Sequence, residues 1–322
     1  MWSMVCLSFW LGTAFAQTQY TSTGTAAIAK ARATALTESP MSNVVGKTFD
    51  HFVTICRHFQ TLLGLKYWLW TRAGKYRLLG GCCGWWVELP YLFEECTDSQ
   101  IANLQWIASQ GILLNNYLAI THPSQPNYVA AVGGSTHGVT GDSFTRISSS
   151  SKTIVDLLEA KGVSWSEYEE DSPYSGFEGN YVNQKTGAND YVRKHKYVSW
   201  FWVGMRANPL INSPLMSYDS VTSNLDRLAK IKNFTMFYTD LNNKQLPQWI
   251  FITPNMSKSS SEIPFQMLIS AANDGHDTSV TTAGKWARSF LTPLLSNANF
   301  TKKTLVLLSK FPDLLRRPRL TA

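Results

Sequence analysis

The sequence predicts an α/β fold in which a mainly parallel β-sheet is sandwiched between helices. Three observations lead to this prediction. Short apolar runs of strand length alternate along the chain with longer segments of helical periodicity. Two of the helical segments stop at a glycine, a frequent residue just past a helix end. With 44% hydrophobic and 16% charged residues among 322, the chain can bury a substantial core.

The expected elements follow one another in chain order. We expect strands at residues 49–55, 112–120, 163–165, 248–253 and 304–308, where the runs are short and apolar, and helices at 101–110, 153–160 and 281–295. The first two helices end at Gly111 and Gly162. In sheets of this kind, the functional residues lie at the carboxyl ends of the strands.

The amino terminus has the pattern of a secretory signal peptide at residues 1–16. Residues 4–15 are apolar but too few to cross a bilayer, and residues 14–16 form an Ala-Phe-Ala cleavage pattern. A buried first helix is the alternative. We therefore expect a secreted protein of the extracellular space or cell wall, without an integral membrane segment. Three N-glycosylation sequons agree with secretion, starting at Asn233, Asn255 and Asn299.

Charge and motif content exclude several classes of function. The net charge of +7 comes from scattered basic residues, with no basic stripe among aromatics, so we expect no nucleic-acid partner. An anionic small substrate fits the charge equally well. A serine hydrolase is excluded because no Gly-x-Ser-x-Gly motif is present: after Ser135, His137 stands where the second glycine belongs. There is also no P-loop or dinucleotide-binding glycine pattern.

Two polar segments that follow or precede expected elements carry side chains suited to phosphate chemistry. His122 lies between an expected strand end and a Pro-constrained turn, where it can donate to a phosphate oxygen or transfer a proton. A histidine satisfied within the turn is the alternative. Ser151 and Thr153 lie at the start of an expected helix, where a hydroxyl can be a nucleophile or simply an N-cap.

A third segment places Asp274 and His276 on either side of a glycine. This is a compact acid/base or metal-ligand pattern, although an ordinary Asp-Gly turn is the alternative. Hydrolysis of a phosphate ester needs a nucleophile, a proton donor for the leaving oxygen and positive charge near the phosphate oxygens. The three segments jointly offer the first two of these and a possible metal ligand for the third.

Six segments in the same order resemble the fungal acid phosphatase and phospholipase C-like phosphoesterase family. The matching segments are residues 122–130, 153–165, 174–179, 189–195, 251–256 and 273–278. The resemblance covers most of residues 46–308. It implies an alkaline-phosphatase-like core and a metal-assisted hydrolase of phosphate mono- or diesters.

The resemblance also implies roles for individual residues. Thr153 is the first candidate for the nucleophile and Ser151 the second. His122, His276 and Asp274 are expected to contact the phosphate or act as acid and base, and His195 is a further candidate. A divalent metal ion of open identity is the implied cofactor, and a phosphate ester is the implied substrate.

Two expected metal-binding motifs are absent from the sequence. The first strand should lead into a Glu-Asn pair, but it leads into Cys56 and a segment rich in Trp, Gly and Cys. Glu95 is a possible stand-in, although no Asn follows it. The last strand should lead into Thr-Phe-Asp-Glu and instead reads Ser309-Lys310. We therefore expect weak metal binding and little turnover.

Insertions interrupt the matching sequence near residues 57–99, 197–216 and 257–272, and a basic tail occupies 309–322. Residues 17–45 are expected to form an N-terminal arm. The two later insertions and the tail each begin with Val-Ser or Ser-Lys, which a translated intron start would give. Retained introns are therefore one hypothesis for these segments, and lineage-specific loops are the other.

The function predicted from the sequence is that of a secreted acid phosphatase, impaired in this chain. The alternatives are a phospholipase C-like phosphodiesterase and, in another class, a non-catalytic remnant that at most binds phosphate. The natural substrate and the oligomeric state stay open.

Overall fold

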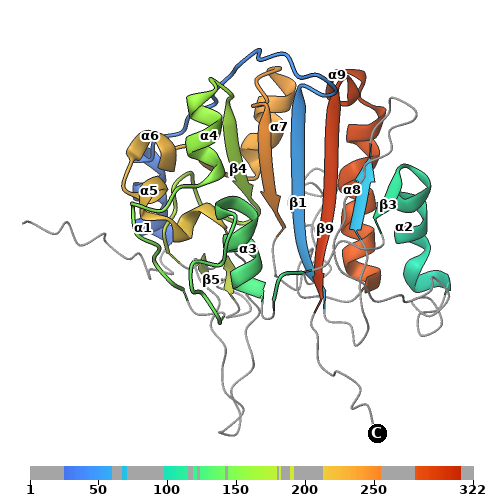
Figure 1. The fold of residues 1–322 in the computed structure, drawn as a ribbon, viewed down its shortest axis with the longest axis horizontal. Helices are drawn as coiled ribbons and strands as arrows, with labels where there is room; N and C mark the ends of the chain where they lie inside the picture. The colour runs from blue at the N-terminus through green and yellow to red at the C-terminus, as the bar shows by residue number, and fades with distance from the viewer. Residues whose placement is uncertain are drawn as a thin grey trace, which may run out of the picture.

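A seven-stranded sheet forms the centre of the molecule (Figure 1). The computed structural model describes residues 25–59, 67–70, 98–114, 119–121, 124–141, 144–179, 181–182, 189–191, 213–254 and 280–312. The strand order is β3-β2-β9-β1-β8-β4-β7. The strands are β1 (His51–Phe59), β2 (Tyr67–Trp70), β3 (Ile112–Leu114), β4 (Trp165–Glu169), β7 (Ile231–Asn233), β8 (Trp249–Thr253) and β9 (Thr304–Pro312). A separate two-stranded sheet pairs β5 (Tyr181–Val182) with β6 (Asn189–Tyr191).

Parallel pairing dominates the sheet, as the sequence predicted. β1 pairs in parallel with β8 and β9, and β4 pairs in parallel with β8 and β7. Only the pairings of β2, with β9 and with β3, are antiparallel among the described strands. The carboxyl ends of the parallel strands therefore meet at one edge, the lower edge in Figure 1.

Helices cover both faces of the sheet and bury a hydrophobic cluster on each. One face packs against α2 (Asp98–Ser109), α7 (Thr235–Asn242) and α8 (Val280–Ser296), with Trp286 and Phe290 of α8 against Ile55 and Ile252. The other face packs against α3 (Ser124–Gly133), α4 (Ile154–Ala160), the 3-10 turn η2 (Leu215–Ser217) and α5 (Asp219–Thr222). The short helices α6 (Leu225–Leu228) and α9 (Ala298–Thr301) complete the described layers.

The predicted N-terminal arm is ordered in its described part. It begins with α1 (Thr25–Thr34) and continues as a strap along the amino-terminal edge of the sheet. Ser42 Oγ donates to Ser164 Oγ at 2.9 Å, just before β4, and the Val44 N–H donates to Gln248 Oε1 at 2.9 Å, just before β8. These bonds tie the strap to the ends of two central strands.

Two predicted strands have different limits in the structure. β3 is described over Ile112–Leu114, and at the other end of the predicted strand the backbone N–H groups of Ile120 and Thr121 donate to Asn127 Oδ1 rather than to a neighbouring strand. β4 begins at Trp165 rather than 163, because the Val163 N–H donates back to the carbonyl of Leu158 and closes the end of α4.

The predicted insertions and tail also contribute to the core. β2 lies within 57–99, Leu215 and Met216 are buried at the end of 197–216, and β9 continues to Pro312 inside the predicted tail. Pairing and burial therefore extend past the matching motifs, and the boundaries of the insertions relative to the family stay a prediction. The signal peptide and the segment 257–272 lie outside the described residues.

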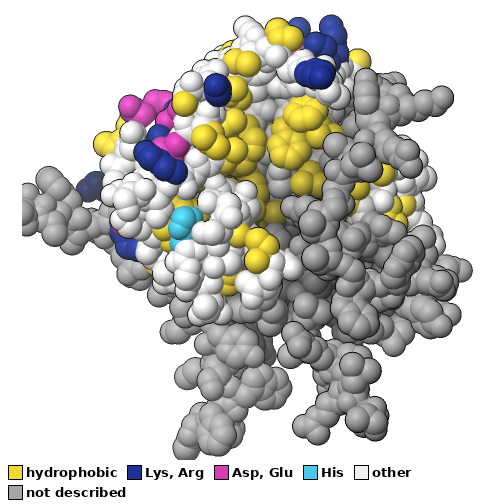
Figure 2. Space-filling view, viewed as in Figure 1, with side chains coloured by type: hydrophobic (Ala, Val, Ile, Leu, Met, Phe, Trp, Pro, Cys, Tyr) yellow, Lys and Arg dark blue, Asp and Glu magenta, His cyan; other side chains and the backbone are white. Residues whose placement is uncertain are grey.

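The described surface carries mixed chemistry. Figure 2 shows apolar side chains gathered near the centre of one face, above the central strands, with lysines and arginines standing apart from one another. None of the helices in the described part of the chain combines the length and apolar character required to cross a membrane.

Candidate active site

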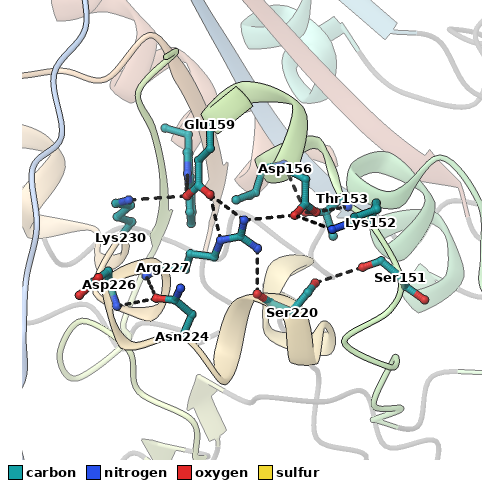
Figure 3. A network of polar contacts seen from close by, with 12 residues as sticks. Ser151, Lys152, Thr153, Asp156, Glu159, Ser220, Asn224, Asp226, Arg227 and Lys230 are labelled. Atoms are coloured by element: carbon teal, nitrogen blue, oxygen red, sulfur yellow. Dashed lines mark hydrogen bonds and ion pairs between the residues drawn. The ribbon is translucent and has the colours of Figure 1, made fainter. Parts of the chain in front are cut away.

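Thr153 is the N-cap of α4, so it stands at the start of the helix that precedes β4 (Figure 3). Its backbone is extended, with φ −126° and ψ 174°, and its Oγ1 accepts a hydrogen bond from the Val155 N–H at 3.2 Å. Asp156 Oδ2 in turn accepts from the Thr153 N–H at 2.8 Å, which completes a capping box. In this geometry Thr153 is an N-cap, and the residue is only 3% exposed.

Arg227 holds this capping box in place. Its guanidinium donates to Asp156 Oδ1 at 3.1 Å, to Glu159 Oε2 at 2.6 Å and to the carbonyl of Ser220 at 2.9 Å. Burial opposes ionisation of Asp156, but the Thr153 N–H and the Arg227 charge outweigh it and lower the pKa of this carboxyl. Asp156 therefore stays ionised and keeps the Thr153 backbone fixed.

Ser151 lies on the loop that enters α4 and is half-buried. The hydroxyl of Ser220 donates to the Ser151 carbonyl at 3.2 Å, which links this loop to α5 (Figure 3). The structure thus brings both candidate nucleophiles to the same end of α4, with Ser151 more accessible than Thr153.

Asn127 of α3 positions the segment that precedes His122. Its Oδ1 accepts from the N–H groups of Ile120 and Thr121 at 2.9 and 3.2 Å, and its Nδ2 donates to the Thr121 carbonyl at 2.8 Å. Three bonds from one buried side chain explain why an Asn stands in the matched motif. Several predicted site residues lie outside the described residues: His122, His195, Asp274, His276, Glu95 and Asn255.

A buried carboxyl pair on β4 was not predicted from the sequence. Glu167 and Glu169 are both 0% exposed, and Glu169 lies at the carboxyl end of the strand. Ser213 Oγ donates to Glu167 Oε2 at 2.7 Å. A glutamate in a strand normally indicates a solvent-facing position. The only signal in the sequence is their i, i+2 spacing, which places both on one face.

Cys56 of β1 and Ser309 of β9 face each other within the sheet, at the positions where the resemblance expects metal-binding acids to follow. Cys56 Sγ lies 3.0 Å from Ser309 Oγ, where the resemblance called for acidic ligands. Burial raises the pKa of the Cys56 thiol to about 12, so this side chain is neutral at acid or neutral pH and does not supply the negative charge of the expected acids. Among the described residues, no group of three or more His, Cys, Asp or Glu is placed to hold a metal ion. The candidate ligands Glu95, His122, Asp274 and His276 lie outside the described residues, so the implied metal ion stays a prediction.

The two described sequons differ in accessibility. Asn299 is exposed at α9. Asn233 is half-buried at the end of β7, and its Nδ2 donates to the carbonyl of Ser172. A glycan on Asn233 would displace this contact, so Asn299 is the better candidate of the two.

Comparisons with known proteins agree with the motif analysis. The model of the Phosphoesterase family matches residues 92–309. An acid phosphatase from Aspergillus fumigatus is 42% identical over 284 residues, which are 88% of this chain and 49% of that protein. A probable acid phosphatase from Kluyveromyces lactis is 47% identical over 223 residues, 68% of this chain and 45% of that protein. A phosphate-repressible acid phosphatase from Penicillium chrysogenum is 41% identical over 88% of this chain and 53% of its own length.

The chain spans about half the length of the curated relatives that it matches. The matched region runs from just before α2 to the middle of β9, and it includes the Thr153 capping box and the buried pair on β4. The order of motifs, the parallel sheet and the family match lead to one conclusion: the chain belongs to the Phosphoesterase family.

Proposed function

We propose that the chain has the reaction of an acid phosphatase, the hydrolysis of phosphate monoesters, and that it is secreted. The observation that supports this most is the combination of the family match with relatives that are named acid phosphatases. The signal-peptide pattern and the exposed Asn299 sequon support secretion. The phospholipase C-like phosphodiesterase has no observation that favours it over the monoesterase.

Thr153 is the proposed nucleophile. The Val155 N–H that donates to Thr153 Oγ1 at 3.2 Å favours negative charge on this oxygen, as attack on phosphorus requires. Asp156 Oδ2 lies 3.4 Å from the same oxygen and is held ionised by Arg227, so it is placed near the departing proton. A small movement of the helix start is needed to expose the hydroxyl to a substrate.

The metal site limits the proposed activity. The family resemblance implies a divalent metal ion that offsets the charge of nucleophile and phosphate. Because β1 and β9 carry a neutral thiol, Cys56, and a hydroxyl, Ser309, where acids were expected, we propose that this chain turns over slowly. If turnover is absent altogether, the chain is a non-catalytic remnant.

The first test is hydrolysis of p-nitrophenyl phosphate at acid pH. The chain is assayed beside a variant that lacks residues 257–272, keeps β2 and η2, and has Thr-Phe-Asp-Glu from residue 309 onward. We expect strong activity only in the variant. Equal activity in both would show that other ligands supply the missing charge. No activity in either would contradict the proposed function. Bis-p-nitrophenyl phosphate, tested in parallel, distinguishes a diesterase.

The second test separates the two roles of Thr153 in whichever form is active. Thr153→Asn keeps an N-cap acceptor but removes the hydroxyl, whereas Thr153→Ser keeps both. For a nucleophile, we expect Thr153→Asn to lose about 1,000-fold or more in kcat with unchanged thermal stability, and Thr153→Ser to retain measurable turnover. Full activity of Thr153→Asn would move the assignment to Ser151, which Ser151→Ala then tests.

A further inference from the structure

The carboxyls of Glu167 and Glu169 are buried together without the partners that buried charges require. Both residues are 0% exposed and project from the same face of β4. Within the described part of the chain, Glu167 Oε1 and both carboxyl oxygens of Glu169 have no hydrogen-bond partner. Ser213 Oγ donates to Glu167 Oε2 at 2.7 Å, and the Leu215 backbone and the Thr253 side chain favour ionisation of Glu167 and Glu169 by less than burial opposes it.

The surroundings of the pair are apolar or neutral. In the sheet, Glu167 is flanked by Phe251 of β8 and Ile231 of β7, and Glu169 by Thr253 and Asn233. The described titratable groups on this face of the sheet include Cys56 on β1, Tyr128 on α3 and Tyr218 beside η2, with His137 against the Tyr218 ring. Lys230 is the described cation nearest to this face: its Nζ lies over the Trp165 ring and pairs with Glu38 and Glu159 rather than with the glutamate pair. Burial raises the pKa of both Cys56 and Tyr218, so neither supplies a charge at acid or neutral pH. Lys232 of β7 faces the opposite side, where it pairs with Asp240.

We propose that Glu167 and Glu169 form an acid pair that stabilises this fold only while it is protonated, so that the protein is built for acid pH and loosens as the pH approaches neutrality. The pair lies where β4 meets the carboxyl edge of the sheet. Ionisation there places two like charges in one apolar layer, which pushes apart β4 and the η2 segment packed on it. This inference does not depend on the reaction that the protein catalyses.

The direction of the pH effect follows from the pKa shifts. Burial is the main cause that raises the pKa of Glu167 from 4.5 to about 8. Burial, followed by the charge of Glu167, raises the pKa of Glu169 in the same direction. The folded protein therefore binds more protons than the unfolded chain above pH 4.5. The stabilisation is fully present below pH 4.5 and is lost as the pH rises toward 8.

The experiment measures the unfolding equilibrium of the full chain by urea denaturation between pH 4.5 and pH 7.5. Each carboxyl can raise the unfolding constant by up to about tenfold per pH unit in this window. We expect an increase of at least about 100-fold between pH 5 and pH 7. Glu169→Gln and Glu167→Gln, which keep shape but cannot ionise, are each expected to flatten this dependence. Asp226→Asn, which removes an exposed carboxylate of α6, is the matched control and should keep it.

Two results would overturn the proposal: a stability that is constant or rises over this range, or a Glu→Gln variant with the full pH dependence. If the variants do not fold, proton release by the unmutated chain tests the proposal instead. Unfolded at pH 6.5 in a weakly buffered solution, it must release about one to two protons, because both carboxyls ionise on exposure. Absence of release, or net uptake, contradicts the proposal.

Discussion

The two faces of β4 bury carboxyl groups in opposite electrostatic settings. On one face, Asp240 of α7 forms an ion pair with Lys232 and accepts hydrogen bonds from Tyr168 Oη and Ser39 Oγ, each at 2.6 Å. Lys232 and Asp240 have 0% and 1% of their side chains exposed. On the other face, Glu167 and Glu169 are as deeply buried, but no cation from the described residues pairs with them.

The difference shows that burial alone does not decide what a carboxyl does. Asp240 has a cation and two hydroxyl donors, so both of its buried carboxyl oxygens are paired. The glutamate pair has no cation among the described residues, and its contacts with Ser213, Thr253 and the Leu215 backbone do not outweigh burial, so it must be neutral to remain buried. The two faces of β4 therefore pack against a structural ion pair, formed by β7 and α7, on one side and carry a pH-sensitive acid pair on the other.

The largest expected effect on stability comes from removing Lys232, the cation that pairs with Asp240. Lys232→Met should destabilise the fold by about 3–5 kcal/mol, because it leaves Asp240 buried with its charge unpaired. The variant should also lose stability as the pH rises, as proposed for the glutamate pair. Urea denaturation at pH 5 and pH 7 measures both effects.

The matched control removes both charges at once. Lys232→Met combined with Asp240→Leu should recover more than half of the lost stability, because a buried ion pair contributes little beyond an apolar pair of similar volume. A double variant as unstable as Lys232→Met alone would show that packing around Tyr168 and Ser39, rather than charge, supports this face.

Arg227 offers an intermediate case, because its side chain is 16% exposed and it pairs with Asp156 and Glu159. Arg227→Gln should cost about 1–2 kcal/mol at pH 6, measured by thermal or urea unfolding. The pKa of Asp156 is lowered, so this contribution is present above its ordinary value of 3.8 and is lost as the pH falls further. The difference between the two proteins should therefore shrink below pH 4, opposite to the trend of the glutamate pair.

Elements with a strong local pattern were predictable from the sequence. The helix expected at 281–295 is α8, Val280–Ser296, and the strand expected at 248–253 is β8, Trp249–Thr253. Both carry continuous or periodic apolar residues that pack on the core, so local pattern and tertiary burial agree. Thr153 as a helix cap was likewise visible, because Asp156 follows it at capping-box spacing.

Features that depend on distant partners were not predictable. β2 lies in a segment without family motifs, and its place in the sheet is set by β9, more than 200 residues away. The burial of Glu167 and Glu169 depends on η2 and β8, which the local sequence of β4 does not specify. Of the predicted site residues, only Ser151 and Thr153 and the sequons Asn233 and Asn299 lie in the described part.

Lys152 provides the smallest expected effect and the sharpest control for Arg227, since both cations approach the same oxygen of Asp156. Lys152 Nζ lies 3.7 Å from Oδ1, but its side chain is 78% exposed, whereas Arg227 lies at 3.1 Å and is largely buried. Water and salt screen the exposed pair, so Lys152→Gln should change the free energy of unfolding by less than about 0.5 kcal/mol. Unfolding at 0.05 and 0.5 M NaCl should show this small effect vanish with salt while that of Arg227→Gln persists. Equal losses of unfolding free energy for Lys152→Gln and Arg227→Gln would mean that exposure does not determine how much each ion pair with Asp156 stabilises this capping box.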